Sequence, residues 1–482
     1  MNKKLLATSL LSAAAFAGLA VGGTYALFTS NAEANIAIQT ATVKYEAIVR
    51  AESLKTYSLG VEQAAGVFEN GGTAALSGNS LTLNNVTPGD KAEFELEIKN
   101  ASTIKTAYRV RITADNGEAA PFKVTGEAAS WVALAPNTNP AENVKVGVEL
   151  PVSVGDDYQG KNYALKISVE AVQANGVASV AAAADLNQAI AEGKIIELQN
   201  DIALTDAIDI QGSPKVDLAG HTLTLPKDKP LMCGVGESIE ISNGTLSSVD
   251  STDATDQLLT VTGGTVSVDN VDFEIASGHK QAVPFKCLSG VLNIKNVNVE
   301  SNRYYVVATN AIDKNAELTI NVEDSSIKVA NDELDNAAIL TNTSAPTHLN
   351  IKHSTISGQR QAVFVRTGNA VIENSTLIST GDFLSKEANV AIDNDRLSGN
   401  WASGDEAPTA ALVVGDRNDT SYNLPASVKL VNTTLTALNG AKKAVIASDG
   451  IYTATLTSDT ASLAADDIVK IGDTSKITVT IA

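Results

Sequence analysis

An eight-residue pattern recurs nine times in the C-terminal two-thirds of this chain and constrains its fold more than any other feature. In each copy the first, third and last positions are apolar, and the fifth is usually a small polar residue. The alternation of the first four positions predicts a short strand with one buried face. The fifth position predicts a tight corner, because Asn and Gly tolerate left-handed backbone angles.

The spacing of the copies indicates how the strands stack. The copies start at Val216, Ile239, Val266, Leu292, Ile320, Leu349, Ala370, Val390 and Val428. Their corner positions hold Asn243, Asn270, Asn296, Asn374, Asn394 and Asn432, with Gly220, Asp324 and His353 as variants. Successive starts lie 20 to 38 residues apart, so each interval predicts one coil of a solenoid. We therefore predict an all-β chain whose residues 185–482 form a parallel β-helix, with the corner residues as a structural ladder along it.

Residues 1–26 have the composition of an export signal. Lys3 and Lys4 precede an apolar stretch, and small residues near its end predict cleavage between Ala26 and Leu27. No second long apolar run follows, and the C-terminus carries no sorting motif. We expect a secreted protein that has no membrane anchor after processing.

The net charge of the chain argues against one class of binding partner. The chain has 35 Lys and Arg against 55 Asp and Glu, a net charge of −20, which argues against nucleic-acid binding because phosphates are held by basic side chains.

Cys233 and Cys287 precede two of the pattern copies by similar distances, which places them two coils apart, roughly 9–10 Å at about 4.8 Å per coil. A disulfide cannot span that distance, so we expect two buried thiols. A disulfide, which export would permit, is the alternative.

The N-terminal third predicts a different β fold. Alternating apolar residues mark strands in Ala37–Tyr45 and around Phe94, Leu96 and Ile98, and Leu83–Asp90 ends in a Pro-Gly turn. These signals predict an antiparallel, jelly-roll-like sandwich of about seven or eight strands over residues 27–176.

Residues 22–175 resemble the TasA/camelysin family of exported matrix proteins. The resemblance lies in the signal junction at residues 22–28, in Ala37–Tyr45, in Leu83–Asp90 and in residues 158–171. It implies trimming by a dedicated type of signal peptidase and assembly into extracellular biofilm fibres, in which the N-terminal segment donates a strand to the next subunit. The assembly strand would contain Leu27, Phe28, Ile36, Ile38, Val43 and Tyr45. The alternative is that this strand folds back into its own sandwich.

The camelysin name also suggests a metalloprotease, which the residues do not support. Zinc catalysis needs about three protein ligands, usually including His. All four histidines lie in the predicted β-helix, and no His-Glu-x-x-His segment occurs. We expect no metal site and no cofactor; a polysaccharide lyase would use calcium on carboxylates, but no pattern here indicates such a site.

A short junction separates the two predicted domains. Residues 177–184 are rich in Ala and Ser and predict a linker, and Asp185 is expected to cap a helix over residues 186–192 that ends at Gly193. This helix would cover the first coil of the solenoid. The segments that follow resemble the first coils of exported right-handed β-helix proteins with the pectate-lyase-like fold, which hosts many functions.

Polar residues recur after three of the pattern copies and could form one outer strip. Stacked coils would align long side chains suited to sugar hydroxyls or carboxylates. The candidate glycan-binding residues are His279, Lys280, Arg303, Tyr304, Gln359, Arg360 and, in an inserted loop, Trp401. The alternatives are a solvated corner for the strip and a packing role for Trp401.

These features predict a secreted structural protein of the cell surface or extracellular matrix. It would assemble into fibres or attach to them, and the β-helix would be a spacer or a glycan-binding adhesin. The competing function is a secreted polysaccharide lyase or glycoside hydrolase, whose chemistry needs clustered acids or a base beside bound calcium. A passive surface-layer component with no ligand is a third option.

Overall fold

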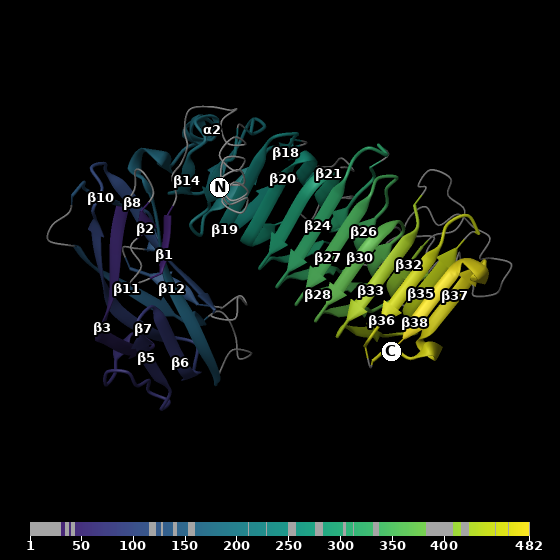
Figure 1. The fold of residues 1–482 in the computed structure, drawn as a ribbon, viewed down its shortest axis with the longest axis horizontal. Coiled ribbons are helices and arrows are strands. Elements are labelled where there is room, and N and C mark those ends of the chain that lie inside the picture. Colours follow the sequence, from purple (N-terminus) through teal and green to yellow (C-terminus); the bar gives the residue numbers. More distant parts are fainter. Residues whose placement is uncertain are drawn as a thin grey trace, which may run out of the picture. The chain divides into compact units, whose positions relative to one another are not determined.

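A computed structural model describes most of the chain. The described residues are 30–33, 38–39, 44–114, 122–126, 129–137, 142–152, 160–210, 212–227, 229–248, 257–274, 283–301, 305–311, 313–330, 337–381, 408–415, 424–448, 450–460 and 462–481. The chain divides into one compact unit that runs to Ala178 and includes Gly193–Glu197, and a second made of Ser179–Glu192 and Leu198–Ala482. Figure 1 shows the first in purple and blue and the second in teal to yellow. None of the described helices is long and apolar enough to cross a membrane.

Two antiparallel six-stranded sheets make up the first unit. One sheet contains β10 (Val132–Leu134), β8 (Thr106–Ala114), β12 (Lys161–Gln173), β6 (Ser80–Val86) and β5 (Thr73–Ser77), with β1 (Ser30–Glu33) also on β12. The other contains β2 (Ile38–Gln39), β3 (Lys44–Ser58), β7 (Asp90–Asn100), β11 (Glu142–Glu149) and β9 (Lys123–Thr125), with β4 (Val61–Glu62) on β3. A short 3-10 helix, η4 (Ala174–Gly176), follows β12.

The core of this unit lies between the two sheets, which confirms the sandwich. The predicted alternation in β7 holds, since Phe94, Leu96 and Ile98 are buried and pack in one cluster with Leu81 and Leu165 of the other sheet. The sequence predicted fewer strands than the structure contains. The additional strands have two to four residues, which is too short for alternation to be recognised.

Parallel pairing between successive coils builds the second unit and confirms the β-helix. Its strands stack in three rows, and β19 (Ser238–Ser248), β20 (Gln257–Glu274) and β21 (Val283–Lys295) each continue from one row into the next. The first row also has β16 (Lys215–Asp217), β24 (Leu318–Glu323), β27 (Thr347–Lys352), β30 (Gly368–Glu373), β33 (Ala426–Val431), β36 (Ala454–Ser458) and β38 (Ile477–Ile481). Strand β14 (Ile195–Leu198) precedes them in the chain, and all of it but Leu198 belongs to the first unit. The second has β15 (Ile202–Ala203), β17 (Thr222–Leu225), β22 (Asn298–Ser301), β25 (Ser326–Val329), β28 (Thr355–Gly358), β31 (Thr376–Ser379) and β34 (Thr434–Ala437). The third has β18 (Leu231–Cys233), β23 (Val307–Ala308), β26 (Ala337–Thr341), β29 (Gln361–Val365), β32 (Ala410–Val414), β35 (Lys442–Ser448) and β37 (Ile468–Gly472), and η5 (Ala465–Asp467) and η6 (Thr474–Lys476) flank β37.

The corner residues adopt the predicted left-handed conformation. Every described corner residue of the pattern has a φ between 45° and 86°. These residues are Gly220, Asn243, Asn270, Asn296, Asp324, His353, Asn374 and Asn432. Pattern starts stand opposite one another in neighbouring coils, as Leu292 pairs with Ile320 and Ile320 with Leu349. The repeat in the sequence is therefore the repeat of the solenoid.

Two of the nine copies depart from the prediction. Val216 pairs with Ile241 rather than with Ile239, because the first corner is two residues longer and places both Ala219 and Gly220 in the left-handed region. The copy at Val390 was wrongly predicted to be a coil: β30 pairs directly with β33, so Ala370 stands opposite Val428 with no coil between them. Asn394, its predicted corner, lies outside the described residues. The pattern matched there by chance, since alternation over four residues is a short signal.

The junction differs from the predicted linker. Residues 177–184 contain strand β13 (Val177–Val180), and the helix α2 (Ala183–Ala191) already begins within them. Ala182 is the N-cap residue, so Asp185 does not cap the helix. It lies in the first turn, where the positive end of the helix dipole stabilises its carboxylate. Gly193 follows the helix with a φ of 64°, as predicted for its stop.

The cysteines are two free buried thiols, as predicted. Cys233 stands opposite Val261, and Val261 opposite Cys287, so the two cysteines lie two coils apart, as predicted, with one coil between them. Burial raises the pKa of Cys233 to about 11 and that of Cys287 to about 12. Both remain protonated and unreactive at neutral pH.

The corner conformation predicts a specific sensitivity at Asn374, which has a φ of 50°. Asn374→Val should lower the free energy of unfolding by about 1–2 kcal/mol, because a branched residue is disfavoured in the left-handed region. Asn374→Asp is the matched control, since Asp tolerates that region. Urea unfolding of the full chain measures both, and equal losses for the two variants would contradict the role of the corner.

Candidate functional site

Two residues of the predicted glycan-binding strip, Gln359 and Arg360, are described by the structure, and Arg360 is not at the surface. Arg360 has only 1% of its surface exposed, and its carbonyl accepts hydrogen bonds from the Ala410 N–H (3.1 Å) and the Ser379 hydroxyl (2.8 Å). Gln359 is half-buried and donates from Nε2 to the Ala330 carbonyl (3.0 Å). These two residues lie between β28 and β29, where the chain passes from one row to the next. Repetition in sequence therefore did not place Arg360 at the surface.

His279, Lys280, Arg303, Tyr304 and Trp401 lie outside the described residues, so no contact among them enters the site.

A column of amides occupies the outer surface of the first row instead. Asn293 donates from Nδ2 to the Ser267 hydroxyl (2.9 Å), Asn321 to Asn293 Oδ1 (2.8 Å), and Asn350 to Asn321 Oδ1 (2.9 Å). Parallel register puts these four residues, the amide column, directly opposite one another. Each Asn amide thus donates one N–H to its neighbour and has a second N–H that this contact does not use. The signal was visible in the sequence, since Asn is the second residue of three consecutive pattern copies.

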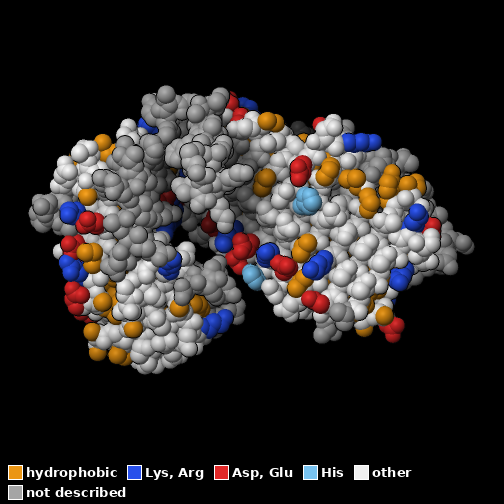
Figure 2. Space-filling model, viewed as in Figure 1, with side chains coloured by type: hydrophobic (Ala, Val, Ile, Leu, Met, Phe, Trp, Pro, Cys, Tyr) orange, Lys and Arg blue, Asp and Glu red, His pale blue; other side chains and the backbone are white. Residues whose placement is uncertain are grey.

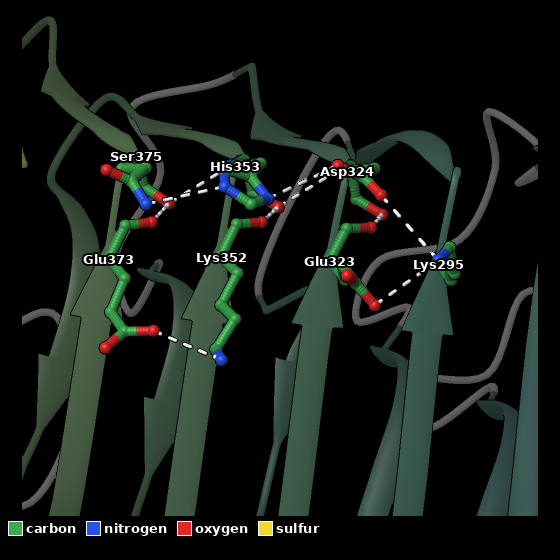
Figure 3. A network of polar contacts seen from close by, with 10 residues as sticks. Lys295, Glu323, Asp324, Lys352, His353, Glu373 and Ser375 are labelled. Carbon is green, nitrogen blue, oxygen red and sulfur yellow. Dashed lines mark hydrogen bonds and ion pairs between the residues drawn. The ribbon is translucent and has the colours of Figure 1, made fainter. Parts of the chain in front are cut away.

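A row of alternating charges runs parallel to the amide column. Asp269, Lys295, Glu323, Lys352 and Glu373 stand opposite one another in successive coils. Lys295 Nζ lies 3.5 Å from a Glu323 oxygen, and Lys352 Nζ 3.2 Å from a Glu373 oxygen (Figure 3). In Figure 2 positive and negative side chains likewise alternate along one margin of a surface that is mostly uncharged. This charge row neutralises the surface locally rather than concentrating one sign.

His353 joins the corner ladder next to the charge row. Its Nδ1 lies 3.7 Å from Asp324 Oδ1, and its Nε2 lies 3.4 Å from Asn374 Nδ2 (Figure 3). Asn374 Oδ1 already accepts from Asn432 Nδ2 (2.8 Å), which orients the Asn374 amide with its N–H groups toward the ring. This arrangement assigns the proton of the neutral ring to Nδ1. Both ring nitrogens face neighbouring corner residues, Asp324 and Asn374, so His353 links adjacent corners and is not positioned as a general base for a substrate.

Metal binding finds no support in the part of the chain that the structure describes. No group of three or more His, Cys, Asp or Glu side chains there could hold an ion. Zinc and calcium sites both need at least that many protein ligands or additional carbonyl oxygens.

The N-terminal strand β1 occupies a slot on β12. Strand β6 pairs with β12 only over Lys161–Lys166, and β8 pairs along the opposite side. Beyond the end of β6, residues Ser30–Glu33 pair antiparallel with Ser168–Ala171. Short β1 therefore supplies the backbone partners for a part of β12 that β6 does not reach.

The described parts of the predicted assembly strand lie in separate strands, β1, β2 and β3. Tyr45 is buried in β3 and donates its hydroxyl to the Val169 carbonyl, so it belongs to the core and not to a mobile start. Ile38 in β2 pairs antiparallel with Tyr45 at the start of β3, so the single strand predicted over Ala37–Tyr45 was wrong: two paired strands lie there. Leu27, Phe28, Ile36 and Val43 lie outside the described residues, as does the predicted cleavage junction at Ala26.

Comparisons with known proteins add little to this geometry. No family model matches the chain, and no curated protein matches it. Among solved structures, the catalytic domain of a GH87 alpha-1,3-glucanase in complex with nigerose has a TM-score of 0.35 and 11% identity, covering 93% of this chain and 98% of that one. A substituted form of that domain, also with nigerose, has a TM-score of 0.33 and 11% identity over 94% and 96%. Similarity at this level assigns no activity.

The charge row predicts a salt-dependent effect at Lys352, whose neighbours in register are Glu323 and Glu373. Lys352→Glu would place three carboxylates in line and should lower the free energy of unfolding by about 1 kcal/mol at low salt. Lys352→Gln is the control, because it removes attraction without adding repulsion. Urea unfolding should show that the Glu–Gln difference shrinks at about 1 M NaCl; equal stability of the two variants at low salt would contradict the charge row.

Proposed function

We propose that this chain is an exported structural protein of an extracellular matrix, assembled by exchange of β1 between subunits. The pairing of β1 with β12 carries this proposal, because it is a four-residue contact made by the first strand that the structure describes. The resemblance of residues 22–175 to TasA/camelysin proteins supports the same process.

Exchange of β1 is physically inexpensive. An exchanged strand would make the same backbone hydrogen bonds to Ser168–Ala171 as the chain's own strand does. Leaving the slot empty exposes unpaired N–H and C=O groups of β12, which favours any strand that fits the register. Swapping therefore replaces one set of contacts with an identical set, and the linkage of subunits is gained without a new interface.

The β-helix fits a stiff, non-catalytic module in this proposal. Its coils are joined by continuous parallel pairing, and its corners and amide column add side-chain hydrogen bonds between coils. The charged side chains of the charge row are paired along the solenoid, whereas a polysaccharide-cleaving site needs carboxylates that converge on one bond. The module would act as a spacer or present a polar surface to glycans.

The proposed function also requires cleavage of the signal peptide. A signal peptidase of the type that serves TasA-like proteins would cleave between Ala26 and Leu27, and the freed N-terminus would leave β1 close to a chain end. The mature protein would be extracellular, and its partners would be further copies of itself or related fibre subunits.

The assembly proposal is tested with mature protein that starts at Leu27. Alternate residues of an antiparallel strand donate to the partner, so Asn31→Pro together with Ala32→Pro removes at least one donor of β1. Negative-stain electron microscopy should show filaments for the unsubstituted protein and single particles for the double variant. Ala32→Val keeps every backbone donor and should still form filaments. Single particles from the unsubstituted protein, or filaments from all three, would reject exchange of β1.

A further inference from the structure

The last strand of the first row that the structure describes, β38, has an edge that can accept another strand. Its register joins it to β36 alone among the described strands, from Ile477 opposite Ala454 to Ile481 opposite Ser458. Figure 1 shows these two strands side by side in yellow. An edge strand presents unpaired N–H and C=O groups, so a further strand can form backbone hydrogen bonds with it.

The side chains of β38 are less covered than those of the coil before it. Leu456 and Val479 stand opposite each other on the same face of the sheet. Leu456 is fully buried, whereas Val479 is only half-buried, as is Ile481 on the same face. The apolar face of β38 therefore lacks a neighbour on its outer side, and a further strand there would bury it.

Strand β38 also lacks the residues that protect edge strands from pairing. Charged side chains and Pro commonly serve that purpose. The neighbouring strand β37 carries the exposed Lys470, whereas β38 contains no charged residue, no Pro and no Gly. All five residues of β38 are β-branched, which favours an extended strand. Of these two strands, β38 is the one whose edge is suited to pairing.

The sequence of β38 indicates which strand fits this edge. Its residues, Ile-Thr-Val-Thr-Ile, read the same in both directions about Val479. In an antiparallel pair of two β38 strands with a twofold axis at Val479, Ile477 stands opposite Ile481 and Thr478 opposite Thr480. Val479 stands opposite its own copy. Every side chain then meets one of its own type, and such aliphatic and Thr–Thr pairs stabilise neighbouring strands.

We propose that β38 is a self-association strand that pairs antiparallel with β38 of a second copy, about a twofold axis at Val479. A twofold contact requires a surface that is complementary to itself, which the palindromic strand provides. The pairing is independent of exchange of β1, which would link subunits through their sandwiches. The contact has five residue pairs, so it is weak between single subunits and stronger when repeated along filaments.

The charge of the chain opposes this contact and gives it a distinct salt dependence. The net charge is −20, and Asp466 and Asp473, which flank β37, are exposed. Salt screens the repulsion between two acidic copies. Pairing through backbone hydrogen bonds and apolar side chains should therefore strengthen as the NaCl concentration rises, whereas a contact held by opposite charges would weaken.

The test uses the mature chain with Asn31→Pro and Ala32→Pro, which keeps exchange of β1 from contributing. Sedimentation velocity should show a monomer–dimer equilibrium that shifts toward the dimer between about 0.1 and about 1 M NaCl. Adding Val479→Lys should weaken dimerisation by at least about tenfold, because like charges would meet at the twofold axis. Val479→Glu should have the same effect.

An equal mixture of the Val479→Lys and Val479→Glu proteins tests the register of the pair. Opposite charges would then meet at the axis, so the mixture should dimerise about fivefold more tightly than either protein alone. Mixing cannot repair a damaged fold, so recovery of the dimer distinguishes pairing from misfolding. Thr457→Lys is the matched control, because Thr457 is exposed on β36, in the neighbouring coil, and should leave the dimer unchanged.

Three results would overturn the pairing of β38. The double proline variant could stay monomeric at every protein and salt concentration, or its dimer could weaken as NaCl rises. The dimer could also survive Val479→Lys, or the mixture could associate no better than its components, which would assign the contact to another part of the chain. Loss of filaments with retention of a dimer that follows these expectations would leave this inference standing and reject exchange of β1 alone.

Discussion

The left-handed corner residue is the constraint on which the β-helix depends. It turns the chain after four alternating residues, so the apolar side chains on both sides of the corner point into the same interior. Because each corner stands on the previous one, its conformation also fixes the register of the next coil. Asn270 donating to Asn243 (3.1 Å) and Asn432 donating to Asn374 (2.8 Å) join these corners directly. A shift of one residue at any corner would move the buried face of a strand to solvent.

Register then determines the outer surface. In the described copies that start at Ile239 or later, residues at the second and fourth pattern positions face outward, so their types form columns along the solenoid. Ser267 and three Asn residues give the amide column, and acidic residues alternating with Lys give the charge row. The side chains of both columns form hydrogen bonds or ion pairs with one another between neighbouring coils. Such pairing favours a rigid module over a reactive site. One part of the chain suited to a partner strand lies instead in the sandwich, at the β1 slot.

Much of the fold was predictable because its determinants are local. Corner conformation, the alternation in β7 and the spacing of the thiols follow from residue type and period, and all were confirmed. The failures have a common cause, since neither burial at a row junction nor strand partnership is encoded in a short pattern. Arg360 is buried although its sequence neighbours suggested an outer strip, and the copy at Val390 matches the pattern without forming a coil.

Disulfide trapping across subunits tests exchange of β1 most directly. Asn31 and Glu170 stand opposite each other in the β1–β12 pair, so Asn31→Cys in one preparation and Glu170→Cys in another can join only if β1 crosses between chains. The native thiols are buried with raised pKa values and do not compete. Mild oxidation of the mixed mature proteins should give a covalent dimer that neither protein gives alone. Absence of that dimer, together with an intrachain disulfide in the doubly substituted monomer under assembly conditions, would contradict the account.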